Sequence, residues 1–243
     1  MRYGIISDIH GNTEGLEACL NELEAQGIDR LVCLGDIVGY GAEPNECCDI
    51  IREKADITIL GNHDAVLVGK LDEEYCHSAA RRALRYSAEQ LSDTNYDFLA
   101  SLKYKTYEDD SCFCHGSPIN AEDFEYVFSL DQAATLTAHF SSLSKVTFVG
   151  HSHVTTAYLV TPAMSLQMSA PRLQLRDGVK YVFNVGSVGQ PRDNDPRACC
   201  VIYDTDEQSV SYFRVEYDIE AAADKIFAAE LPQAFGQRLF HGV

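Results

Sequence analysis

The sequence predicts an α/β protein built from strands, covering helices and a cluster of polar residues at the strand ends. Three observations lead to this prediction. In the first half of the chain, short apolar runs alternate with segments of helical periodicity. In the second half, short strand-like runs follow one another with little helix between them. Side chains of His, Asp and Asn come directly after the apolar runs of the first half.

The composition is that of a globular protein. Of the 243 residues, 46% are hydrophobic and 23% are charged, which argues against disorder. Acidic residues outnumber basic residues by 37 to 19, and the net charge of −18 argues against extended binding to nucleic acid or to membranes. A small phosphorylated substrate stays compatible with this charge, because bound metal ions reverse the local field of an acidic protein.

The N-terminus and the cysteines predict a cytoplasmic location. Residues 1–7 contain no signal-peptide pattern, and no apolar run reaches the length of about 18 to 20 residues that crosses a bilayer. The nine cysteines are odd in number and include no C-x-x-C motif, so we expect reduced, buried thiols. Cys112 and Cys114 beside His115 are compatible with a zinc site, but apolar strand residues are the favoured interpretation.

Strands and helices alternate through the first half. The apolar run 4–7 precedes a helical pattern that includes Leu16, Cys19, Leu20 and Leu23, and Gly27 is a suitable stop. This order predicts a largely parallel sheet covered by helices. A polar helix is expected at 45–54. Four further apolar runs lie at 31–34, 57–60, 112–114 and 146–149.

The second half predicts an antiparallel-rich sheet packed on the first. The pair Asp177-Gly178 predicts a type I′ hairpin between two of its strands, and residues 219–227 predict a closing amphipathic helix. Since no linker interrupts the chain, we expect a single domain over residues 1–243. Its six short strands are expected at 158–160, 165–168, 172–175, 180–184, 198–203 and 210–215.

A helical insertion is predicted at about residues 73–102. It lies between the motif Gly61-Asn62-His63-Asp64 and the next strand. An insertion beside a chemical motif either covers the site and shapes substrate access or simply connects two strands. Both interpretations stay open at the level of the sequence.

Residues that bind metals follow five apolar runs. The carboxyl ends of strands in an open α/β sheet share one edge, so these residues are expected to converge. Each residue alone has an ordinary structural role, such as a helix cap or a polar turn. Their recurrence at five strand ends predicts a single metal cluster. The residues are Asp8, His10, Asp36, Asn62, His63, His115, His151 and His153.

The ordered set of these motifs resembles the signature of the calcineurin-like metallophosphoesterase superfamily. The signature spans positions 8 to 153, and the second half fits the remaining part of that fold. The resemblance implies a four-layer αββα sandwich of two mixed β-sheets flanked by helices. The motifs are Asp8-Ile9-His10, Gly35-Asp36 with Gly39 and Gly41, Gly61-Asn62-His63-Asp64, His115 and Gly150-His151-Ser152-His153.

The resemblance implies two divalent metal ions and hydrolysis by in-line attack of a metal-bridging hydroxide. Carboxylate, amide and imidazole ligands without a thiolate suit Mn²⁺ or Fe first, with Zn²⁺ and Ni²⁺ as alternatives. The two implied ligand sets share one carboxylate: Asp8, His10, Asp36 and His153 for one ion, and Asp36, Asn62, His115 and His151 for the other.

The resemblance also implies a catalytic role for His63. Its imidazole would face the leaving group as a general acid or stabilise the charged transition state. Asp64 would orient that imidazole, as carboxylates beside active-site histidines do. A simple turn is the alternative for Asp64.

A loop at residues 186–192, with the sequence GSVGQPR, supplies a candidate for substrate binding. It resembles a loop in a bacterial and archaeal branch of the superfamily that includes small phosphodiesterases and diadenosine tetraphosphatase-like proteins. Arg192 would contact a substrate phosphate through two N–H groups. The alternative is a surface ion pair with Asp193 or Asp195. Arg197 is a weaker candidate of the same kind.

The predicted function is that of a binuclear phosphoesterase acting on a small phosphodiester or nucleotide, including dinucleoside polyphosphates. A phosphomonoesterase or phosphoprotein phosphatase on the same site is the alternative. A non-catalytic scaffold of the same fold is disfavoured because no ligand position is missing. A mononuclear iron oxygenase is disfavoured because it needs only two histidines and one carboxylate. The sequence makes no prediction of oligomeric state.

Overall fold

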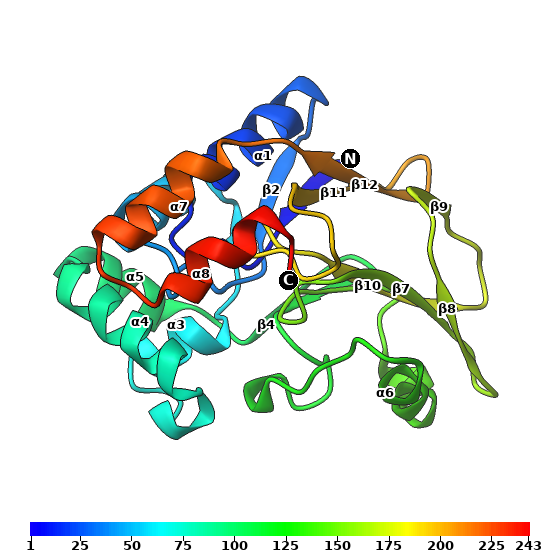
Figure 1. The fold of residues 1–243 in the computed structure, drawn as a ribbon. Coiled ribbons are helices and arrows are strands. Elements are labelled where there is room, and N and C mark those ends of the chain that lie inside the picture. The colour runs from blue at the N-terminus through cyan, green and yellow to red at the C-terminus, as the bar shows by residue number, and fades with distance from the viewer.

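Two six-stranded sheets lie face to face in the computed structural model, which describes residues 1–243 (Figure 1). The first sheet has the order β3-β2-β1-β11-β12-β9, and the second has the order β4-β5-β6-β10-β7-β8. The strands of the first sheet are β1 (Arg2–Ile6), β2 (Arg30–Cys33), β3 (Ile57–Thr58), β9 (Arg172–Gln174), β11 (Ala198–Asp204) and β12 (Ser209–Val215). The strands of the second sheet are β4 (Lys105–Glu108), β5 (Ser111–Cys114), β6 (Val146–Val149), β7 (Thr155–Val160), β8 (Ser165–Met168) and β10 (Lys180–Val185).

Helices cover the outer faces of both sheets. Helix α1 packs on the first sheet with α7 beside it, and α6 packs on the second sheet at the opposite side of the molecule (Figure 1). The α-helices are α1 (Thr13–Ala25), α2 (Pro44–Lys54), α3 (Asn62–Leu67), α4 (Ser78–Gln90), α5 (Asp93–Ser101), α6 (Leu130–Thr135), α7 (Ile219–Ala228) and α8 (Gln233–Gln237). Short 3₁₀ turns are η1 (Glu73–Tyr75), η2 (Ala121–Asp123), η3 (Leu136–Ser142) and η4 (Arg238–Phe240).

The layers follow from the alternation of side chains along the strands. Successive residues of a strand point to opposite faces of its sheet. Ile5 of β1 therefore joins the core between the two sheets, and Ile6 joins the core under the helices. A third apolar core lies between the second sheet and α6. The predicted four-layer αββα sandwich is confirmed.

Helix α1 shows how the sequence encodes these elements. Asn12 is its N-cap, and the side chain of Asn12 accepts a hydrogen bond from the backbone N–H of Gly15 at 2.9 Å. Leu16, Cys19 and Leu23 are fully buried on one face, as the helical spacing predicts. The chain then turns away at residues 26–27, close to the predicted stop.

Both sheets are mixed, so the expected division into a parallel-rich sheet from the first half and an antiparallel-rich sheet from the second half is wrong. Each sheet takes three strands from residues 1–149 and three from residues 155–215. Strand β1 is parallel to β2, with Tyr3 beside Arg30, and antiparallel to β11, with Tyr3 beside Tyr203. Strand β1 is apolar on both faces, which suits a central position with a neighbour on each edge.

The prediction of a hairpin at Asp177-Gly178 is wrong. A turn does occur there, and Gly178 has the positive φ of +81° that such turns require. However, β9 belongs to the first sheet and β10 to the second. Both edges of β10 are already paired, to β6 and to β7, so β9 has no edge of β10 to join. The turn carries the chain from one sheet to the other.

Strand β4 was not predicted, because its sequence KTYE lacks an apolar run. It is an edge strand that forms because the neighbouring β5 offers an unpaired edge, and Lys105 lies beside Cys114 in this antiparallel pair. The predicted insertion contains α4 and α5, which pack on α3 and α2. No helix in the structure has both the length and the apolar character needed to cross a membrane.

Candidate metal centre

The predicted site residues lie together where strands of the two sheets end. Asp8 and His10 follow β1, Asp36 follows β2, and Asn62 and His63 open helix α3. His115 follows β5, and both His151 and His153 follow β6. All eight residues are buried, none being more than 4% exposed. Loops from both sheets therefore build one polar cluster inside the molecule.

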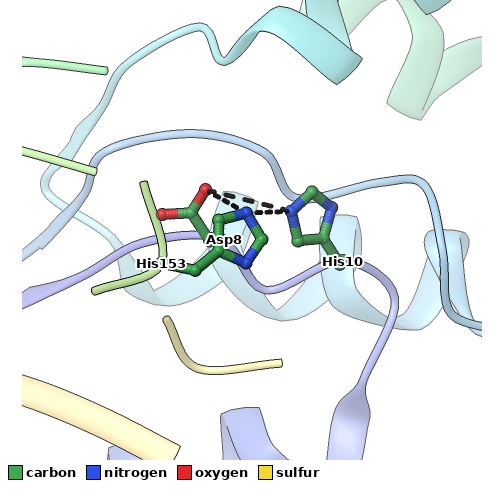
Figure 2. Close-up of side chains that lie close together, drawn as sticks. All are labelled: Asp8, His10 and His153. Atoms are coloured by element: carbon green, nitrogen blue, oxygen red, sulfur yellow. Dashed lines mark hydrogen bonds and ion pairs between the residues drawn. The ribbon is translucent and has the colours of Figure 1, made fainter. Parts of the chain in front are cut away.

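Asp8, His10 and His153 form the first group of ligand atoms (Figure 2). The Nε2 atom of His153 lies 3.2 Å from Asp8 Oδ1 and 3.2 Å from His10 Nε2. His10 Nε2 lies 3.8 Å from the same carboxylate oxygen. Three potential ligand atoms thus face a common point.

Asp36, His115 and His151 form a second group. His115 Nε2 lies 3.3 Å from Asp36 Oδ2 and 3.1 Å from Asn62 Oδ1. Asp36 also faces the first group, because its Oδ2 atom lies 3.7 Å from His10 Nε2. Asp36 is therefore the carboxylate that lies between the two groups.

Backbone carbonyls fix the orientation of three of the imidazoles. The Nδ1 atoms of His10, His115 and His153 lie 2.9, 2.8 and 2.6 Å from the carbonyl oxygens of Val38, Leu34 and Gln190, respectively. A carbonyl oxygen only accepts hydrogen bonds, so Nδ1 donates in all three residues, and in a neutral ring this leaves the Nε2 lone pair free for a metal. This is the arrangement by which metal-binding histidines are usually held.

Unpaired polar atoms show that the cluster fits divalent metal ions. Asp8 Oδ1 and His151 Nε2 are buried and have no hydrogen-bond partner. Burial raises the pKa of Asp8 to about 7 and lowers the pKa of His151 well below its usual range, which leaves that imidazole neutral and able to bind metal. Buried lone pairs that face one another are costly unless a cation lies between them. Oxygen and imidazole donors of this kind suit divalent transition metals.

The backbone around the cluster is strained. Five of the candidate ligands have φ between +52° and +65°, which is the left-handed region that residues other than glycine rarely adopt. Such strain concentrates at functional sites, where the surrounding structure maintains it. The five residues are Asp8, His10, Asp36, His151 and His153.

His63 lies beside the cluster and has an unpaired ring nitrogen. Its backbone N–H donates to Asp36 Oδ1 at 2.8 Å, while its Nδ1 atom is buried without a partner. Burial lowers the pKa of His63 to about 4. Only glycine is tolerated at position 39, because a Cβ atom there would lie 2.4 Å from His63 Nδ1. The ring of Tyr40 is 4.6 Å from the His63 ring.

Asp64 does not orient His63, which corrects the prediction from the sequence. Its Oδ2 atom accepts the backbone N–H groups of Asp36 and Gly61 at 2.8 and 3.1 Å. Its Oδ1 atom accepts those of Ile37 and Val38 at 3.0 and 3.2 Å. With four backbone donors, both oxygens are fully used, and the carboxylate holds the loop that carries Asp36.

Arg192 lies beside Tyr40, whose ring adjoins the candidate metal centre. Its guanidinium carbon lies 5.6 Å from the centre of the Tyr40 ring, and its Nε atom is buried without a partner. The alternative of an ion pair with Asp193 or Asp195 does not occur, because those carboxylates pair with Arg214 and, for Asp195, also with Arg197. Arg197 is thus engaged in a surface ion pair and is not available as a second phosphate ligand.

Three further residues at the cluster were not predicted. Tyr126 stacks on the ring of His151 with 3.8 Å between ring centres, and Tyr40 lies 4.5 Å from the ring of His10. Arg238, near the C-terminus, lies 4.5 Å from the Tyr40 ring centre. A signal in the sequence existed only for Tyr40, which lies between Gly39 and Gly41 in the motif that follows Asp36.

A family model described as the calcineurin-like phosphoesterase superfamily domain matches residues 1–208. The chain belongs to this superfamily. The resemblance proposed from the motifs is therefore confirmed over most of the chain. As a calcineurin-like phosphoesterase, the protein is a metal-dependent phosphoester hydrolase, and its His and Asp clusters are the groups suited to bind divalent metals.

Similar proteins agree with this membership along the whole chain. An uncharacterized protein of Methanocaldococcus jannaschii is 36% identical over 242 residues, which cover 98% of this phosphoesterase and 97% of the relative. The crystal structure of a metallophosphoesterase from Sphaerobacter thermophilus superimposes with a TM-score of 0.86 and 35% identity, with all of both chains covered. A hypothetical protein of Pyrococcus horikoshii shares the fold, with a TM-score of 0.79, 20% identity, and 100% and 98% of the two chains covered.

Proposed function

We propose that this phosphoesterase hydrolyses a small phosphodiester or a nucleotide, dinucleoside polyphosphates included, with two divalent ions in the cluster. We assign Mn²⁺ or Fe as the first choice of metal. The ligand atoms that support this assignment are buried, face one another and include Asp36 between two groups. The proposed ligands are Asp8, His10, Asp36 and His153 for one ion, and Asp36, Asn62, His115 and His151 for the other.

When bound, a pair of divalent ions supplies an activated water and neutralises charge on the phosphate. Side chains of the protein supply the remaining contacts to the substrate. The imidazole of His63 is neutral and lies beside the proposed ligands His10 and Asp36, where it would hold a hydrogen bond to the leaving oxygen or to the phosphate. Arg192, whose Nε atom has no partner within the protein, would bind a phosphoryl oxygen of the substrate.

Tyr126 is the observation that favours a diester or a nucleotide. Its ring stacks on His151, and the residue as a whole is 40% exposed. A hollow of about 480 Å³ lies beside it and is also lined by Tyr75 and Phe124. Aromatic faces of this kind stack on nucleobases and on other flat groups. A second organic group on the phosphate therefore has a surface to contact next to the metal centre.

Nine free and buried cysteines support the proposed cytoplasmic location, where thiols stay reduced. Cys112 and Cys114 lie in β5 as buried strand residues. The zinc alternative for these two residues has no support from their packing, because both contribute to the apolar core under α6.

Activity of the metal-reconstituted protein on three substrates tests the proposal. The protein is loaded in turn with Mn²⁺, Fe²⁺, Zn²⁺ and Ni²⁺ and assayed with bis(p-nitrophenyl) phosphate, p-nitrophenyl phosphate and diadenosine tetraphosphate. We expect kcat/KM to be higher for the diester or the dinucleotide than for the monoester. A clear preference for the monoester would instead support a phosphomonoesterase or phosphoprotein phosphatase. Inactivity on all three substrates with every metal would overturn the proposal.

A further inference from the structure

Arg238 is a second arginine held in a fixed position beside the proposed site. It opens the C-terminal turn η4, and its guanidinium packs against two aromatic rings, 4.5 Å from the centre of Tyr40 and 4.8 Å from that of Phe235. Its Nε atom donates to the side-chain oxygen of Gln190. The backbone oxygen of the same Gln190 accepts from His153, so one residue positions both a proposed ligand and this guanidinium.

Arg192 and Arg238 form a positive pair that lacks a counter-ion. Neither guanidinium forms an ion pair with a carboxylate, although the chain has 37 acidic residues. Each has one nitrogen that is buried without a hydrogen-bond partner, Nε in Arg192 and Nη2 in Arg238. Burial, and then the charge of Arg192, lowers the pKa of Arg238 to about 10, so Arg238 is still charged at neutral pH.

The positive field of this pair extends to a neighbouring helix. His77 caps the N-terminus of α4, and burial followed by the charges of Arg238 and Arg192 lowers its pKa. Two half-buried like charges without a counter-ion are costly, and an unpaired donor adds to that cost. The aromatic faces of Tyr40 and Phe235 and the neutral amide of Gln190 offset only part of it. An anion would complete the site.

We propose that Arg238 and Arg192 together bind a second phosphoryl group of the substrate, next to the one that is hydrolysed. The inference rests on the proposed function and narrows its substrate class to esters that carry at least two phosphoryl groups. Tyr40 supplies the connection, because its ring contacts the imidazoles of His10 and His63 as well as both guanidinium groups. The phosphate at the metal centre and the one at the arginine pair would thus lie on neighbouring sides of one ring.

Guanidinium groups suit this role because their N–H groups match two phosphate oxygens at once. The unpaired Nη2 atom of Arg238 is the donor that a phosphoryl oxygen would satisfy. A substrate with a single phosphate would leave this donor unpaired. Because an unpaired buried donor is costly, the site should bind an anion with two phosphoryl groups more tightly than an anion with one.

Anion binding to the metal-loaded protein tests the inference without turnover. We would measure the affinities of inorganic pyrophosphate and orthophosphate by calorimetry for the wild-type protein, Arg238→Gln and Arg238→Lys. We expect pyrophosphate to bind at least about tenfold more tightly than orthophosphate to the wild-type protein. Arg238→Gln should weaken the binding of pyrophosphate about 10- to 100-fold and the binding of orthophosphate much less. Arg238→Lys, which keeps the charge but loses the planar fork, should lie between the two.

Arg197→Gln is the matched control, since it removes an exposed arginine that pairs with Asp195. It should leave both affinities as in the wild-type protein. Metal content and thermal unfolding verify that each variant is folded. No preference for pyrophosphate in the wild-type protein, or equal losses for both anions in Arg238→Gln and Arg238→Lys, would overturn the inference.

Kinetics separate this inference from the proposed function. In Arg238→Gln, we expect kcat/KM to fall about 10- to 100-fold more for diadenosine tetraphosphate than for bis(p-nitrophenyl) phosphate. Adenosine 3′,5′-bisphosphate shows whether a separate second phosphate serves as well as an adjoining one. If the wild-type protein hydrolyses bis(p-nitrophenyl) phosphate and Arg238→Gln loses activity equally on all substrates, the inference is overturned. The proposed function would still stand. Inactivity of the wild-type protein, combined with binding of pyrophosphate that depends on Arg238, would overturn the proposed function alone.

Discussion

The Asp36 carboxylate contacts residues of both ligand groups. One of its carboxylate oxygens accepts the backbone N–H of His63, and the other faces the imidazoles of His10 and His115. Its backbone N–H is in turn held by Asp64. The charge of Asp36 therefore acts on both groups of ligands. Its backbone is held in place by the hydrogen bond to Asp64.

Asp36→Asn should remove that charge and keep the shape of the side chain. We expect at least one of the two metal ions to be lost on dialysis, and the hydrolysis rate to fall with it, because an amide oxygen is a weaker ligand than a carboxylate. Metal per chain and the rate on bis(p-nitrophenyl) phosphate are the measurements. Asp49→Asn, at an exposed position on α2, is the control. A variant with two ions and full activity would contradict the assignment of Asp36.

His63→Ala distinguishes two roles of the unpaired imidazole. If His63 supplies a proton, the rate should fall about 10²–10⁴-fold for an alkyl leaving group and much less for p-nitrophenolate, which leaves as an anion. If it stabilises charge on the phosphoryl group, both substrates should lose activity equally. Both metal ions should stay bound in either case, with His139→Ala as a control. Loss of an ion in His63→Ala would show that His63 is itself a ligand.

At the scale of elements, the start of α3 is joined to the loop after β2 through one carboxylate. Asp64 accepts four backbone N–H groups, three from residues 36–38 and one from Gly61. Gly61 approaches so closely that a Cβ atom there would lie 2.1 Å from Asp36 Oδ1. The two loops are thus packed as a unit, and this unit positions Asp36, Asn62 and His63.

Asp64→Ala should therefore destabilise the protein even without metal. Four buried donors would lose their acceptor, and we expect the free energy of unfolding to fall by more than about 3 kcal/mol. Urea denaturation of the metal-free protein measures this change. The isosteric Asp64→Asn should also destabilise, because its NH₂ group would face two backbone donors. Unchanged metal-free stability combined with a large loss of activity would instead restore the catalytic role predicted from the sequence.

The sequence predicted that the candidate ligands converge, because each follows an apolar run, and the edge-sharing rule for strand ends applies even though the strands belong to two sheets. It did not predict how the strands pair. The runs 172–175 and 180–184 look like neighbours, yet β10 already has two partners. Which strand pairs with a given edge depends on all the strands of the sheet, so a local sequence pattern cannot predict it.

Arg238 and Tyr126 could not be predicted for a related reason. Arg238 reaches the site only because α7 and α8 fold back over the chain, which brings it next to Tyr40 and Gln190. Tyr126 lies outside any strand or helix, so no periodicity indicated where its ring would point. Residues placed by tertiary contacts alone leave no trace in motif spacing.

At the scale of the whole molecule, metal binding should contribute to stability. The cluster buries two carboxylates and several imidazoles between the sheets and loops, and metal binds this arrangement far better than it binds the unfolded chain. With metal at about 100 times its dissociation constant, we expect a gain of about 2.7 kcal/mol, or a rise of about 5–10 °C in Tm.

Thermal unfolding before and after chelation, and again after metal is restored, measures this contribution. The Asp36→Asn variant should show a smaller shift, because it binds less metal. An identical Tm in the chelated and metal-loaded forms of the wild-type protein would contradict the proposed centre.

The central position of β1 also has a consequence for biosynthesis. This strand leaves the ribosome long before β11, which completes one of its edges and ends at Asp204. At typical rates of translation, the nascent chain waits roughly 10–40 s for that partner. An apolar strand with an open edge invites pairing with other chains during this interval. We therefore expect the newly made protein to depend on chaperones that shield β1, and slower translation of the second half to increase aggregation.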